Sequence, residues 1–183
     1  MRKIFNGCAL LLAASLWMTG CSKPAATSPA QVYTIYKHKV SLAPPQDWKV
    51  RQEPSPDNKE EVAAVVFEPP QGKWHLAVTI TEGVKQDQAF MDRLGNGIRA
   101  RKGTIVKQWY EHKLDDPDTK NAYFMEFDLQ DAGPENPHRK GMQVQIFTQK
   151  GVLYSLVFQA VPEVYDANRS TFLAMVKSFQ LAP

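Results

Sequence analysis

Histidine and cysteine are the residue types that most often hold metals or act as nucleophiles. This chain of 183 residues has four histidines and two cysteines. No two histidines share the His-Glu-x-x-His spacing that lets one helix hold zinc, because the four are widely separated, at His38, His75, His112 and His138. We therefore expect no metal and no other cofactor, although folding could still bring distant histidines together.

Three further patterns resemble chemical motifs only in part. Ser155 and Ser178 lie in no Gly-x-Ser-x-Gly elbow. Residues 95–100, Gly-Asn-Gly-Ile-Arg-Ala, superficially match a dinucleotide fingerprint, but that motif must open a helix after a strand, and here it lies inside a helical pattern. The aspartates of residues 115–118 lack the Gly and distal Glu of a calcium loop, so a solvated turn is the better interpretation.

Both cysteines belong to the N-terminal segment. Arg2 and Lys3 precede residues 4–22, which carry no charge, and residues 8–17 are almost continuously apolar. This pattern is typical of a secretory signal peptide and is slightly short for a membrane span. If the segment is removed, the folded domain contains no cysteine, which excludes a thiol nucleophile, a disulfide or a thiolate metal site within it.

The segment ends in Met18-Thr-Gly20-Cys21, which resembles the lipobox of bacterial lipoproteins. The resemblance implies that residues 1–20 are cut off between Gly20 and Cys21 and that the Cys21 thiol carries lipid. Two or three acyl chains attach a protein to a membrane effectively permanently, because each buried CH₂ contributes ~0.8 kcal/mol. The alternative is an uncleaved anchor in which Cys21 is an ordinary thiol.

The next residues predict where the lipid would hold the protein. Residue 22 is Ser and not Asp, which in enterobacterial lipoproteins resembles the signal for the periplasmic face of the outer membrane. Residues 21–31 are rich in Pro, Ala, Ser and Thr and are expected to form a flexible tether. An extended limit of ~35 Å for such a tether would keep the domain close to the bilayer.

Charge and composition restrict the remaining possibilities. The whole chain has a formal charge of +3, and loss of Arg2 and Lys3 with the signal peptide lowers this to about +1. Nucleic-acid binding requires an excess of cations, so we expect no nucleic-acid partner. An apolar fraction of 43% is ordinary for one globular domain, which we place at residues 32–183 and expect to be a monomer.

Short apolar segments between turn signals predict an antiparallel β-sheet. In residues 74–81, for example, Leu76 and Val78 alternate with Ala77 and Thr79, so that one face is apolar and the other is small and polar. Residues 53–60 read as a polar loop. The expected strands are residues 33–36, 39–42, 48–50, 62–67, 74–81, 104–114, 122–129, 141–149 and 152–161.

Two helices are expected, each with one apolar stripe. The first would be capped by Asp87 and stopped by Gly103, with two internal glycines that would allow close approach to the sheet. The second would begin at Pro162. The two stripes are Phe90, Leu94 and Ile98, and Tyr165, Phe172, Val176 and Phe179.

Arg99, Arg101 and Lys102 form a basic cluster at the end of the first helix, with Lys107 near it in sequence. Cations in a last helical turn are favoured by the helix dipole alone, which is the simpler interpretation. The alternative is a surface that attracts acidic partners or anionic headgroups. This basic cluster is the partner surface that the sequence predicts.

The order of elements predicts an α+β fold, an antiparallel sheet flanked by helices. Residues 33–48, with a short strand, a Pro-containing turn and Trp48, resemble the opening of PsbP-like domains, and residues 154–162 with Lys177-Ser-Phe179 resemble their end. The resemblance covers about residues 32–181 and implies an α/β/α layered sandwich. PsbP relatives are mostly nonenzymatic accessory or assembly factors, and the family has no catalytic set to carry over.

Three functions follow from these observations. The first is a lipid-anchored, noncatalytic periplasmic accessory factor that binds an unidentified envelope protein at a membrane. The second is a lipoprotein that carries a small apolar ligand between the sheet and a helix. The third is a hydrolase whose Ser, Asp, Glu or His residues are assembled by folding, which the missing nucleophile elbow makes the weakest of the three.

Overall fold

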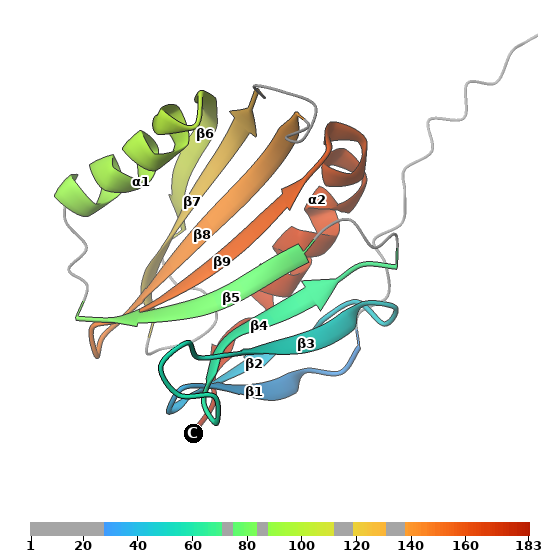
Figure 1. Ribbon diagram of the computed structural model, residues 1–183, viewed down its shortest axis with the longest axis vertical. Helices are drawn as coiled ribbons and strands as arrows, with labels where there is room; N and C mark the ends of the chain where they lie inside the picture. Colours follow the sequence, from blue (N-terminus) through green and yellow to red (C-terminus); the bar gives the residue numbers. More distant parts are fainter. Residues whose placement is uncertain (1–27, 71–74, 84–87, 112–118, 131–137) are drawn as a thin grey trace, which may run out of the picture.

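The computed structural model describes residues 28–70, 75–83, 88–111, 119–130 and 138–183, with side chains given for most of them (Figure 1). The lipobox cysteine, Cys21, and the predicted helix cap, Asp87, lie outside these residues. The elements are β1 (Gln31–Ile35), β2 (His38–Leu42), β3 (Lys49–Pro54), β4 (Val62–Glu68), β5 (His75–Glu82), α1 (Gln88–Ala100), β6 (Gly103–Glu111), β7 (Thr119–Leu129), β8 (Arg139–Thr148), β9 (Val152–Ala160), α2 (Pro162–Lys177) and β10 (Gln180–Leu181).

The centre of the fold is a seven-stranded antiparallel sheet with the strand order β3-β4-β5-β9-β8-β7-β6. Strand β9 shows how it divides the core. Leu153 packs on the side of α1, whereas Tyr154, Leu156 and Phe158 pack on the side of α2, because successive side chains of a strand point to opposite faces. The two helices therefore cover opposite faces, as Figure 1 shows. The predicted α+β, α/β/α layered fold is confirmed.

The face beneath α2 holds the larger core. Phe158 stacks on Tyr165 at 5.5 Å between ring centroids and on Phe172 at 5.4 Å. Phe172 and Val176, predicted for the buried stripe, are almost fully buried. Phe179 is also buried, but it follows the helix, because α2 ends at Lys177.

The face beneath α1 holds a smaller core around Met91, Ile98 and Phe127. Close approach of helix and sheet depends on glycine. A Cβ at Gly95 would lie 3.3 Å from the Cδ1 atom of Ile105, and one at Gly103 would lie 2.6 Å from a methyl carbon of Ile98. By contrast, a Cβ at Gly97 would meet only open space.

A second, smaller sheet consists of the N-terminal strands β1 and β2 and the C-terminal strand β10, in the order β1-β2-β10. The sequence pattern does not predict β10, because a strand of two residues has no periodicity. Strand β3 also continues to Pro54, into the expected polar loop. This is possible because β3 is an edge strand, where polar residues and a proline are tolerated.

The α1–β6 connection differs from the expected glycine stop. Lys102, and not Gly103, takes the left-handed conformation, with φ 57°. Gly103 is needed instead for its lack of a Cβ, because Ile98 and Leu129 pack directly over it. Among the described residues, no helix is long and apolar enough to cross a membrane.

Candidate functional site

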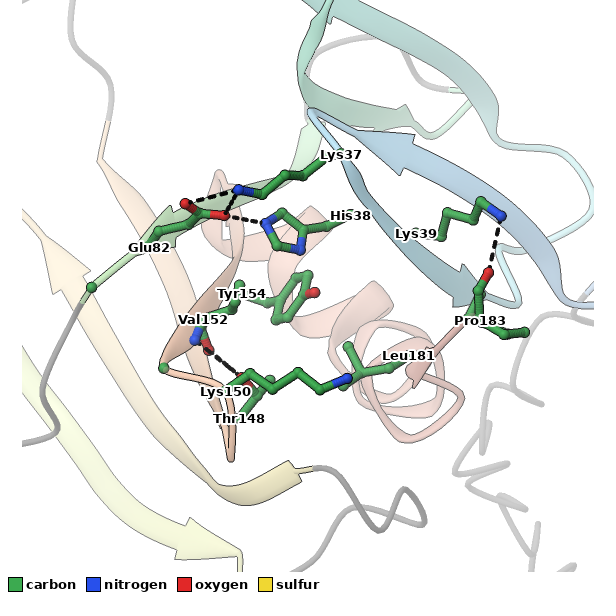
Figure 2. A pocket seen from close by; sticks show the side chains of 13 residues that line it. Lys37, His38, Lys39, Glu82, Thr148, Lys150, Val152, Tyr154, Leu181 and Pro183 are labelled. Carbon is green, nitrogen blue, oxygen red and sulfur yellow. Dashed lines mark hydrogen bonds and ion pairs between the residues drawn. The ribbon is translucent and has the colours of Figure 1, made fainter.

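A pocket of about 950 Å³ opens where four segments of the chain meet. It lies between the β1–β2 turn, the end of β5, the β8–β9 turn and the residues that follow β10 (Figure 2). Its lining includes Lys37, His38, Lys39, Glu82, Thr148, Lys150, Val152, Tyr154 and Leu181. We call it the lysine pocket.

Glu82 joins the two sheets at one side of the lysine pocket. Its carboxylate lies 3.0 Å from the Nζ atom of Lys37 and 2.5 Å from the Nε2 atom of His38 (Figure 2). These hydrogen bonds, first that of His38 and then that of Lys37, lower the pKa of Glu82 from its ordinary value. A second hollow of about 480 Å³ lies against the same three residues, with Tyr36 and Glu61 in its lining.

The β1–β2 turn holds Lys37 and His38 in position at some conformational cost. Tyr36 has a φ of 49°, which for a residue with a Cβ costs roughly 1–2 kcal/mol. Its backbone N–H donates a hydrogen bond of 2.7 Å to the carbonyl of Val62 on β4. The turn is therefore fixed to the large sheet, and its tyrosine side chain is left 39% exposed.

The β8–β9 turn is fixed in a similar way. The Thr148 hydroxyl donates to the carbonyl of Val152 at 3.0 Å and accepts the N–H of Val152 at 3.1 Å. Gly151 supplies a positive φ of 74°, and its carbonyl accepts the N–H of Gly83 at 3.1 Å. These contacts place Lys150 at the pocket. The Thr148 hydroxyl uses its hydrogen bonds within the turn.

The floor of the lysine pocket is apolar. Tyr154 is 3% exposed and packs edge-on against His38 and Phe179, at ring distances of 6.3 and 5.2 Å. Val152 and Leu181 extend the floor on either side (Figure 2). The pocket thus combines an apolar floor with a rim of charged groups, which suits binding of an amphipathic anion.

The histidines do not form a metal site among the described residues. No group of three His, Cys, Asp or Glu side chains that could hold a metal occurs there. His38 pairs with Glu82, and His138 pairs with Asp128 at 2.6 Å. His112 and the side chain of His75 lie outside the described residues.

The two serines considered for hydrolysis have structural partners. The Ser155 hydroxyl donates to Gln145 Oε1 at 2.6 Å. The Ser178 hydroxyl donates to the carbonyl of Met175 at 2.7 Å and accepts the N–H of Ala43 at 2.9 Å. Neither serine is hydrogen-bonded to a described histidine, the usual partner that activates a catalytic serine.

The basic cluster lies apart from the lysine pocket, where α1 leads into edge strand β6. Arg99 donates to Asn96 at 3.1 Å, and Arg101 donates to the carbonyl of Gly97 at 3.3 Å. The Nζ atom of Lys107, which is near the cluster in sequence, lies 5.0 Å from the centroid of the Trp109 ring. Arg99, Arg101 and Lys102 are all exposed, while their role as a partner surface stays a prediction.

Comparison with known proteins identifies the family. Residues 30–181 match the family PsbP. The chain belongs to the PsbP family. The predicted resemblance to PsbP-like domains is therefore confirmed over nearly the whole described domain.

One solved structure supports the same PsbP fold, and two further structures are similar to the chain. The solution structure of cyanobacterial PsbP (CyanoP) from Synechocystis sp. PCC 6803 has a TM-score of 0.58 and 14% identity, covering 89% of this chain and 96% of that one. PA94 from Pseudomonas aeruginosa, described as a putative regulator, has a TM-score of 0.47 and 14% identity, covering 84% of this chain and 96% of that one. LpqN of Mycobacterium tuberculosis, described as involved in cell envelope biogenesis, has a TM-score of 0.47 and 12% identity. The match covers 85% of this chain and 87% of that one. No curated protein matches the chain.

The lysine pocket could not be found from sequence spacing. Lys37 and His38 lie 45 and 44 residues from Glu82, and the strands between them have no motif that links the two segments. The one available signal is weak: a lysine-rich turn, Tyr36-Lys-His-Lys39, sits between two short strands. Charged turns of this kind are common on protein surfaces and do not indicate a site by themselves.

Proposed function

We propose that this PsbP-family chain is a noncatalytic accessory factor, held by lipid on Cys21 at the periplasmic face of a bacterial outer membrane, where it binds an envelope protein. The lipobox resemblance supports the anchor, and family membership supports the accessory role. The observation that carries the binding role is the lysine pocket, a recess at the surface with a charged rim.

The arrangement of the core favours binding at the surface over transport of an apolar ligand. A carrier would need space between the sheet and a helix. In the part of the chain that the structure describes, Phe158, Tyr165 and Phe172 fill that space beneath α2 with stacked rings. Two hollows lie instead at the turns around Glu82.

The anchor is tested by Cys21→Ser. We expect this substitution to abolish labelling by a fatty-acid probe and to move the domain from the membrane fraction to the soluble fraction. A control, Ser22→Ala, leaves the thiol in place and should keep both the label and the membrane location. Unchanged membrane retention of Cys21→Ser would refute lipid anchoring at this residue.

The partner is tested by photo-crosslinking in intact cells. A photoreactive phenylalanine analogue at Tyr36 samples the rim of the smaller hollow beside the lysine pocket, and one at Val106, which is 64% exposed on β6, samples the far edge of the large sheet. A discrete protein adduct from either position, reduced by Cys21→Ser, would support an accessory factor at a membrane. Absence of any adduct from both positions would count against a protein partner.

A further inference from the structure

We propose that the lysine pocket binds an extended acidic segment of the partner polypeptide, one in which carboxylate side chains flank an apolar side chain. This inference rests on the proposed function and adds the place and the chemistry of recognition. It also differs from the sequence-based prediction, which placed the partner at the basic cluster beyond α1.

The first argument is charge. Lys37, Lys39 and Lys150 line the pocket, and Glu82 is the one acidic side chain in its lining. Glu82 already serves both Lys37 and His38. Lys150 is exposed and makes no ion pair with any described residue, while the Lys39 ammonium donates to a main-chain oxygen of Pro183, the last residue of the sequence, at 3.0 Å. Lys150 therefore remains for a carboxylate of a ligand, and the Lys39 ammonium, which has three N–H donors, can donate to a second carboxylate beside its bond to Pro183.

The second argument is the apolar floor. Tyr154 and Val152 are at most 9% exposed, and Leu181 is half-buried beside them. A free inorganic anion would contact the lysines but leave this floor unused. A peptide that places Leu or Val between two acidic side chains would use both, because alternate side chains of an extended segment point in opposite directions.

The third argument is shape, and it distinguishes a peptide from a bilayer. The pocket volume of about 950 Å³ lies at the upper end of the roughly 300–1,000 Å³ of ordinary ligand sites. A flat array of anionic headgroups would contact the exposed lysines at the rim but not the recessed Tyr154. The rim is also held in place by the Tyr36–Val62 and Gly83–Gly151 hydrogen bonds, so little ordering is needed when a ligand binds.

Glu82 has a specific part in this scheme. Its carboxylate occupies Lys37 and His38 in the absence of a ligand, and it repels carboxylates that approach the same groups. Removal of its charge should therefore strengthen binding of an acidic peptide, whereas removal of a lysine charge should weaken it. Nonspecific attraction to the whole domain would change with the same two signs, so the pocket is identified by a third variant, in which loss of a lysine charge outside the pocket leaves binding unchanged.

The probe is a labelled peptide, Glu-Leu-Glu-Leu-Glu, titrated into the full chain purified from membranes in a nonionic detergent and followed by fluorescence anisotropy. At low salt we expect Lys150→Gln to weaken binding about two- to five-fold, the range of one exposed ion pair. Glu82→Gln should tighten binding by a similar factor. Lys59→Gln, at an exposed lysine outside the pocket, is the matched control and should have no effect.

Two further arms separate the alternatives. The peptide Gln-Leu-Gln-Leu-Gln tests the floor without the charges and should bind at least ten-fold more weakly. Vesicles of phosphatidylglycerol should not displace the acidic peptide. Melting temperatures within about 2 °C of wild type for both pocket variants would exclude loss of structure as the cause.

Several results would overturn the proposal. These are failure of the acidic peptide to bind, equal binding by Lys150→Gln, displacement by anionic vesicles, or loss of binding when the basic cluster is changed to Gln instead. The proposed function would survive each of them if the crosslinking experiment yields a protein adduct. Conversely, the acidic peptide could bind specifically while crosslinking yields no adduct. The peptide specificity of the pocket would then stand, and the proposal of an envelope protein partner would be refuted.

Discussion

Docking of α2 on the sheet can be tested by truncating one aromatic ring. Phe172 is 1% exposed and stacks on Phe158 at 5.4 Å between ring centroids and an interplanar angle of 25°. Phe172→Ala removes a fully buried ring and leaves a cavity beneath the helix. We expect a loss of about 3–5 kcal/mol in the free energy of unfolding, because both transfer energy and packing are lost.

Urea unfolding gives the measurement. With a slope of about 2 kcal/mol per molar urea, this loss lowers the midpoint by roughly 1.5–2.5 M. Phe172→Leu retains most of the apolar volume and should cost less than about 1.5 kcal/mol. Leu173, the next residue on α2, is only partly buried, so Leu173→Ala should cost clearly less than Phe172→Ala. A loss below about 1 kcal/mol for Phe172→Ala would show that α2 does not depend on this contact.

Further predictions concern packing, pH, metal and charge. Gly141→Ala should cost about 1–3 kcal/mol by urea unfolding, because its Cβ would overlap the ring of Phe127; unchanged stability would contradict the packing described. The lowered pKa of Glu82 contributes stability that is present above its unfolded value, near 4.5, and is lost as pH falls through the folded value, so Glu82→Gln should flatten the acid limb of a Tm-against-pH curve. A chelator should leave Tm unchanged, and a fall together with metal found by elemental analysis would overturn the expectation of no metal. Replacing the basic cluster with Gln should leave folding intact and, if it is a partner surface, slow capture of the partner at low salt.

The fold could be predicted from the sequence where an apolar pattern repeats over many residues. Phe172 and Val176 indicated the buried side of α2, and the alternation of Leu76 and Val78 with Ala77 and Thr79 indicated the two faces of β5, because each pattern spans several turns or residue pairs. Elements with little periodicity were missed. Gln180 and Leu181 form β10 only because β2 is there to pair with them.

The candidate site was predicted less well, for the same physical reason. The basic cluster was visible because its three cations are close in sequence. The lysine pocket depends on contacts between Lys37, His38 and Glu82, which only the packing of the small sheet against the large one brings together. The partner surface inferred from sequence and the pocket found in the structure are therefore independent hypotheses.

The closure of the small sheet has a consequence for how the protein folds. Strand β2 pairs with β10, and the N–H of Ala43 reaches Ser178, 135 residues further along the chain. Contacts of such high sequence separation form slowly, because the closure entropy of a long loop must be overcome first. The β1–β2 hairpin, which carries Lys37, His38 and Lys39 of the lysine pocket, therefore gains its last neighbour only after the seven-stranded sheet and α2 have been made. A nascent or truncated chain would expose the apolar side chains of Val40 and Leu42, and such a species is prone to aggregate until its final segment arrives.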